Sequence, residues 1–132
     1  MDITIGDSFS TSREITDELI RKFAELSGDY NPIHLDEEFA SKTRFGKRIA
    51  HGMLIGAFIS AVLGNGFKGY TGIYLSQTMK FTNPVFIGDT VTITSTVTHI
   101  REDKKIITLE NICRNSNGKT LVTGESAIML ID

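Results

Sequence analysis

The chain has 132 residues, of which 40% are hydrophobic and 23% are charged. This length suits one domain, expected over residues 1–132, and the composition is that of a folded globular protein. The formal net charge of −2 provides no basic surface for nucleic acid, so no nucleic-acid partner is expected. The longest apolar stretch, Met53 to Leu63, is shorter than the roughly 20 residues that cross a bilayer, so no membrane anchor is expected.

The cysteine content favours a reducing environment. Cys113 is the one cysteine of the sequence, so no intrachain disulfide can form. The first residues, MDITIGDSF, lack the basic segment and apolar stretch of a secretory signal. We therefore expect a cytoplasmic protein.

The first half of the chain predicts helices. Residues 3–9 could form a short strand or an extended arm. A helix is expected between the N-cap Thr16 and the terminating Gly28, because apolar residues recur there with helical spacing. Residues 29–34, DYNPIH, predict a structured loop, since proline and the residue before it do not continue a helix easily. Asp36 can cap a short helical turn that runs through Ala40.

The second half begins with a helix and continues as strands. Residues from about His51 to Leu63 are apolar on nearly every side, which predicts a helix surrounded by protein. After Gly72 the apolar residues alternate, which predicts strands near 73–81, 91–97, 105–114 and 119–131. Helices followed by antiparallel strands predict an α+β domain in which a sheet curls around a central helix. The open sheet edges favour pairing with a second copy.

Asp29 and His34 are the first candidates for chemistry. A carboxylate and an imidazole in one proline-containing loop could hold and polarise a water molecule, and histidine transfers protons well near neutral pH. Read alone, the spacing also allows purely structural roles for the two residues. In that interpretation Asp29 caps the next turn and His34 is a packed loop residue.

Gly52 is the second candidate, at the start of the apolar helix. Free N–H groups at a helix N-terminus could bind a carbonyl oxygen that gains negative charge, and glycine permits close approach. A glycine needed for tight helix packing is the alternative. Ser60 lies inside this helix without a GxSxG motif, so it is interpreted as a packing residue or pocket hydroxyl.

Three further patterns do not by themselves indicate a functional site. Gly64, Gly66 and Gly69 spell GxGxxG, but a helix precedes them and a strand follows, which is the reverse of the dinucleotide-binding order. The three histidines show no metal-ligand spacing, so no metal is expected. A basic cluster could be a solvated loop or a docking site for the phosphates of a nucleotide-bearing substrate; it comprises Lys42, Arg44, Lys47 and Arg48.

The motifs together resemble those of the MaoC-like hydratases. The string D-x-N-P-x-H covers Asp29 to His34, and A-H-G-M-L follows from Ala50 to Leu54. Supporting strings are I-Y-L-S-Q from Ile73, F-T-N-P-V-F-I-G-D from Phe81 and T-G-E from Thr123. The chain is most similar to the short (R)-specific enoyl-CoA hydratases that supply polyhydroxyalkanoate synthesis, and the resemblance covers nearly all of it.

The resemblance implies a hot-dog fold, a homodimer and a hydro-lyase of fatty acid metabolism. The implied reaction is reversible syn addition of water to a trans-2-enoyl-CoA, giving an (R)-3-hydroxyacyl-CoA, with no cofactor or metal. Asp29 and His34 would hold the water, with Asp29 the preferred base, and the Gly52 N–H would bind the thioester oxygen. Asn31 would brace the loop, Ser60 would lie along the acyl pocket, and Leu63 would limit acyl length.

Three alternatives remain beside this interpretation. A (3R)-hydroxyacyl dehydratase acting on acyl carrier protein would use the same chemistry on another carrier. A thioesterase would direct water at the carbonyl carbon, for which D-x-N-P-x-H is not the expected pattern. A non-catalytic acyl-CoA-binding module would keep the pocket and lose Asp29 or His34, and both are present.

Overall fold

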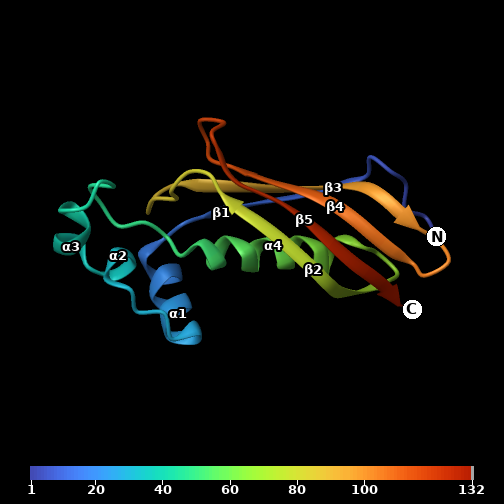
Figure 1. Ribbon diagram of the computed structural model, residues 1–132, viewed down its shortest axis with the longest axis horizontal. Helices are drawn as coiled ribbons and strands as arrows, with labels where there is room; N and C mark the ends of the chain where they lie inside the picture. Colours follow the sequence, from blue (N-terminus) through green and yellow to red (C-terminus); the bar gives the residue numbers. More distant parts are fainter. Residues whose placement is uncertain (132) are drawn as a thin grey trace.

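The computed structural model describes residues 1–131, which form helices and one antiparallel sheet (Figure 1). The helices are α1 (Asp17–Ser27), α2 (Pro32–Leu35), α3 (Glu37–Ser41) and α4 (Gly52–Gly66). The strands are β1 (Ser8–Glu14), β2 (Thr71–Phe81), β3 (Thr90–Arg101), β4 (Ile106–Arg114) and β5 (Thr120–Ile131). The sheet order is β1-β3-β4-β5-β2, and every neighbouring pair is antiparallel. The predicted α+β class is confirmed.

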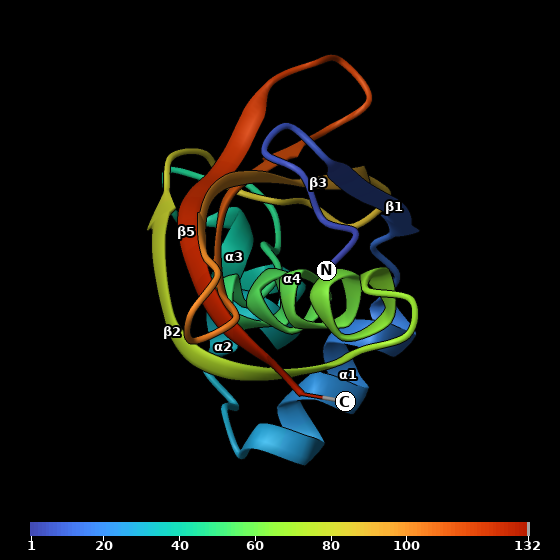
Figure 2. The ribbon, with the colours of Figure 1, turned by 90° about the vertical axis from the view of Figure 1, so that its right-hand side faces the viewer.

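The sheet curls around α4, and the core lies between them (Figure 2). Alternate side chains of β3 point inward, so Val91 and Ile93 are fully buried as their spacing predicts. Ile55 and Ile59 of α4 meet this face and are also fully buried. None of the helices within residues 1–131 has the length and apolar character needed to cross a membrane.

The caps of α1 are those expected from the sequence. The Thr16 hydroxyl accepts a hydrogen bond from the Leu19 N–H at 3.1 Å, which satisfies one of the free donors of the first turn. Gly28 ends the helix in the left-handed conformation, with φ of 80°. The chain leaves α1 directly into Asp29, so the helix end sets the position of the first candidate residue.

Two local expectations differ from the structure. The first strand does not begin near Ile3 but at Ser8, because its residues pair with β3 along the edge of the sheet. The loop after α1 contains the short helix α2, with Pro32 in its first turn, where the missing N–H costs nothing. The Asn31 side chain caps α2 by accepting from the Ile33 N–H at 3.2 Å.

The helix α4 is not enclosed on every side, contrary to the sequence-based expectation. One stripe is exposed in the single chain, with Met53 57% accessible and Ala57, Ser60 and Ala61 following at helical spacing. The neighbouring edge strand β2 is also exposed. A register shift between Tyr74 and Ser76 interrupts its alternation, so consecutive apolar residues face solvent there.

A group of hydrogen-bonded side chains, here called the polar row, crosses the inner face of the sheet. Asn111 Nδ2 donates to Ser95 Oγ at 2.8 Å, and Asn111 Oδ1 accepts from Ser126 Oγ at 2.9 Å and from Gln77 Nε2 at 2.7 Å. The single Ser126 hydroxyl hydrogen is shared between Asn111 Oδ1 and Gln77 Oε1. Ser95, Asn111 and Ser126 are fully buried, so the row satisfies its polar groups internally.

Candidate active site

A cavity of about 430 Å³ opens at the N-terminal end of α4. The loops after α1 and α3, the start of α4 and the end of β2 contribute its walls. Its polar lining includes Asp29, His34 and His51, and Phe81, Val85 and Val122 are among its apolar lining residues. The structure thus brings the two predicted members of the catalytic pair into one pocket.

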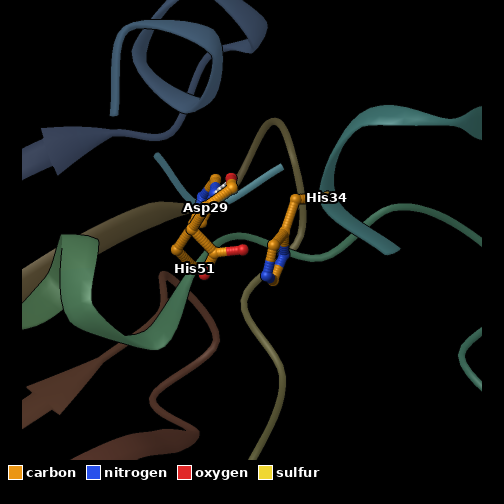
Figure 3. A group of neighbouring side chains, drawn as sticks. All are labelled: Asp29, His34 and His51. Atoms are coloured by element: carbon orange, nitrogen blue, oxygen red, sulfur yellow. Dashed lines mark hydrogen bonds between the residues drawn. The ribbon is translucent and has the colours of Figure 1, made fainter. Parts of the chain in front are cut away.

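Asp29 is exposed in the loop that follows α1, and hydrogen bonds to neighbouring residues fix its position. Its N–H donates to Ser27 Oγ at 3.1 Å, and its Oδ1 accepts from the Asn31 N–H at 3.1 Å. The purely structural interpretation of Asp29 as a turn-capping residue is therefore partly right. Capping uses one carboxylate oxygen, and Figure 3 shows the side chain directed toward the His34 ring.

His34 is 8% exposed and has a defined tautomer. Its Nδ1 lies 2.8 Å from the Ile49 carbonyl oxygen, which can only accept, so the proton is on Nδ1. The Nε2 atom then carries the lone pair. Burial lowers the pKa of His34 below its ordinary value of 6.5, and the nearby His51 acts in the same direction, while the Ile49 hydrogen bond and Asp29 oppose the shift. A neutral imidazole with a free Nε2 is suited to accept a proton.

The third residue of the group, His51, was not assigned a role from the sequence. Its Nε2 lies 3.0 Å from the backbone oxygen of Asp29, the contact drawn as a dashed line in Figure 3. Its ring stacks on His34 with 3.9 Å between centroids and 28° between planes. Asp29, His34 and His51 are called the histidine cluster below. The A-H-G string pointed to this position, but only Gly52 was interpreted from it.

The histidine cluster also has the composition of a small metal site. Each residue offers a nitrogen or oxygen atom, and these atoms lie within 4.8 Å of one another, a proximity that the spacing in sequence did not predict. The two rings stack with 28° between their planes. Each ring also uses one nitrogen to contact a backbone carbonyl.

Gly52 is the first residue of α4, where the N–H has no partner within the helix. His51 precedes it and makes no side-chain cap, so the positive end of the helix dipole faces the cavity uncovered. A Cβ at Gly52 would stand 2.7 Å from Phe81 Cε1. The packing interpretation of this glycine is thus supported, and it is compatible with a role in binding an oxyanion.

The remaining predicted site residues lie away from the cavity. Asn31 caps α2 through its side chain, but it does not line the cavity within the described chain. Ser60 is exposed on the stripe of α4, and Leu63 is 2% exposed in the core. Within residues 1–131 neither of these two lines the cavity.

The basic cluster is divided by the fold. Arg48 is 6% exposed, and it donates to the His34 carbonyl oxygen at 2.7 Å and to Asp17 at 2.6 Å. It therefore links α1 to α2 in the interior, and the prediction that it could dock phosphates is not supported. Its contact, with that of Arg21, lowers the pKa of Asp17. Of the cluster, Arg44 lines the cavity, while Lys42 pairs with Glu38 on the surface.

Comparison with known proteins identifies the class. Residues 3–115 match the family model described as a MaoC like domain, so the chain belongs to the MaoC-like family. The fold is the predicted hot-dog fold. One solved match, titled an (R)-hydratase from A. caviae involved in PHA biosynthesis, superposes with a TM-score of 0.92 at 40% identity, covering 97% of both chains.

Two curated relatives are named for related reactions on different acyl carriers. An (R)-specific enoyl-CoA hydratase of Rhodospirillum rubrum is 46% identical over 98% of this chain and 89% of its own. A mitochondrial 3-hydroxyacyl-(acyl-carrier-protein) dehydratase of Arabidopsis thaliana is 33% identical over 97% of this chain and 78% of its own. Both predicted carriers of the acyl group are therefore represented among its relatives.

Proposed function

We propose that this protein is an (R)-specific enoyl-CoA hydratase, a hydro-lyase that reversibly adds water to a trans-2-enoyl-CoA. The observation that carries the proposal is the convergence of three groups on one cavity. These are the Asp29 carboxylate, the lone pair of His34 Nε2 and the uncapped start of α4 at Gly52. The similarity to named enoyl-CoA hydratases supports the same reaction.

Asp29 and His34 would hold the reacting water. Both present acceptors, because His34 keeps its ring proton on Nδ1. A water that donates one O–H to each would have its oxygen lone pairs free to attack carbon 3 of the enoyl group. The pair then takes one proton from the water and returns it to carbon 2 on the same face. The sum is H–OH added across the double bond, with Asp29 the preferred base.

Gly52 would stabilise the charge that develops during this attack. As the water oxygen bonds to carbon 3, electron density moves through carbon 2 to the thioester oxygen. The Gly52 N–H at the positive end of α4 would donate to that oxygen. The apolar wall of Phe81, Val85 and Val122 would contact the acyl chain and exclude bulk water.

The carrier of the acyl group divides the two leading candidates. Arg44 lines the cavity and could contact a phosphate of coenzyme A, which favours the CoA ester. The plant relative named as a carrier-protein dehydratase supports the alternative, in which the same residues act on an acyl group carried by acyl carrier protein. The two readings share the chemistry and differ in what Arg44 contacts.

A homodimer in a reducing, cytoplasmic setting completes the proposal. The exposed edge strand β2 and the exposed stripe of α4 lie side by side, and pairing of two β2 strands would satisfy the open edge.

Ser60 belongs to this stripe, so we expect it to approach an acyl chain across that interface. Leu63 packs beneath the stripe, and Leu63→Ala is expected to widen acyl-length acceptance; unchanged selectivity would exclude it as a determinant.

The deciding experiment mixes the purified protein with crotonyl-CoA and follows loss of the enoyl-thioester absorbance, with chiral analysis of the product. Hydration to the (R) product, lost in Asp29→Asn and His34→Ala, is expected. If no short or medium enoyl-CoA is hydrated, the CoA hydratase is excluded. The same substrates on acyl carrier protein, with an assay for thioester hydrolysis, then test the alternatives.

A further inference from the structure

His51 connects the separate parts of the proposed active site. It is 2% exposed and immediately precedes α4. Its Nε2 contacts the Asp29 backbone oxygen, one ring face stacks on His34, and its ring meets Phe23 of α1 edge-on at 5.0 Å. One side chain thus contacts α1, the catalytic loop and α2 from the start of α4.

The contacts of His51 fit one tautomer. A backbone carbonyl only accepts, so Nε2 carries the proton and donates to Asp29. His51 Nδ1 is the one buried side-chain nitrogen or oxygen within residues 1–131 that lacks a hydrogen-bond partner. The His51 ring therefore has one nitrogen that donates to a backbone carbonyl and one that is buried without a partner.

The unpartnered nitrogen indicates why histidine stands at this position. If position 51 needed packing alone, phenylalanine would fill similar space without burying an unsatisfied atom. The imidazole adds one thing to the packed ring, which is the Nε2–H donor to Asp29.

We propose that His51 is a positioning residue for the hydration, an inference that rests on the proposed function. Its Nε2–H fixes the backbone of Asp29, and therefore the start of the carboxylate side chain. Its ring face fixes the plane of His34, so that Nε2 of His34 is directed at the water. His51 acts through both members of the pair, and the reacting atoms contact those two residues.

Two substitutions at His51 separate the effect of its Nε2–H donor from the effect of its ring stacking on His34. His51→Phe keeps an aromatic ring against His34 and removes the donor, while His51→Gln keeps an N–H donor near Asp29 and removes the ring. We expect His51→Phe to lower kcat about 10²-fold with little change in KM, because misplacing a catalytic group by about 1 Å has that effect. His51→Gln should recover about tenfold of this loss. His99→Phe, an exposed histidine on β3, is the matched control and should leave kcat unchanged.

Nitrogen-15 NMR of the histidine rings in the wild-type protein tests the inference without turnover. It should find the His51 proton on Nε2 and the His34 proton on Nδ1. A His51 proton on Nδ1, a kcat for His51→Phe within twofold of wild type, or equal losses in the two variants would overturn the proposal. If the wild type hydrates no enoyl thioester, the proposed function fails, and the NMR result still decides whether His51 donates to Asp29.

Discussion

Two groups of polar side chains, the polar row and the histidine cluster, differ in how their hydrogen bonds are completed. The polar row in the sheet closes on itself, so that each buried member has a side-chain partner from a neighbouring strand. The histidine cluster does not, because His34 Nε2 faces the cavity and His51 Nδ1 has no partner within residues 1–131. Closed networks hold a fold together, and polar atoms left open next to a cavity are available for chemistry.

The largest expected effect comes from the histidine cluster. Asp29→Asn should lower kcat by about 10²- to 10⁴-fold, the range for losing a general acid or base. Asparagine keeps an Oδ1 for the Asn31 N–H, so the free energy of unfolding should change by less than about 1 kcal/mol. Steady-state kinetics and urea unfolding measure the two quantities.

Combining Asp29→Asn with His34→Ala sharpens the same point. Groups that act on one water molecule fail together, so the double variant should be about as slow as the worse single variant. Multiplicative losses would show that the two residues act independently, and the shared-water mechanism would then be wrong.

The polar row should respond in the opposite way. Asn111→Ala removes the residue that bonds to Ser95, Ser126 and Gln77, leaving buried groups unsatisfied, and should cost about 3 kcal/mol of the free energy of unfolding. Its kcat at 25 °C should stay within about twofold of wild type, since no atom of the row lines the cavity. Urea unfolding measures the first quantity.

An exposed pair supplies the control for this loss. Ser12 and Thr92 share a 2.8 Å hydrogen bond on the outer face of the sheet, and Ser12→Ala should cost less than about 0.5 kcal/mol. If Asn111→Ala costs no more than this, the row contributes little to stability.

Two glycines of α4 give a smaller contrast between the site and the rest of the helix. A methyl group at Gly52 would crowd the Phe81 ring and the cavity, so Gly52→Ala should lower kcat/KM about tenfold. At Gly64 nothing lies within 4 Å of an added Cβ, and Gly64→Ala should stabilise the fold by about 0.5–1 kcal/mol without loss of activity. Equal kinetics for both variants would remove Gly52 from the site.

The sequence predicted much of this, and the failures have a common cause. The caps of α1 and the strand alternation follow from local spacing, whereas the pairing of Asp29 with His34 was implied by the motif resemblance. Arg48 was misassigned because its partner Asp17 lies 31 residues earlier, so that burial depends on tertiary packing. His51 was missed for the same reason, since its donor function depends on a carbonyl 22 residues away. Contacts between elements carry no periodic signal along the chain.

The pH dependence of stability gives the smallest effect and separates the two groups by direction. The pKa of His34 is lowered in the folded protein by burial, so the unfolded chain binds more protons just below pH 6.5. Stability present above pH 6.5 should therefore fall as the pH drops toward the folded pKa of His34. The Asp17 carboxyl, whose pKa is lowered from 3.8, contributes only at more acidic pH.

At alkaline pH the free energy of unfolding should fall because of a tyrosine that is bonded to the polar row. Tyr74 donates to Gln77 at 2.7 Å, and the partial burial of its ring raises its pKa above 10.0. The folded state therefore resists ionisation, and the stability of the protein falls as the pH rises through the folded pKa. His34→Gln should flatten the acid slope alone, and Tyr74→Phe the alkaline slope alone, in unfolding measured from pH 5 to 11. If either variant changes both slopes, the two groups are coupled through α4 and are not the independent units that their hydrogen bonds define.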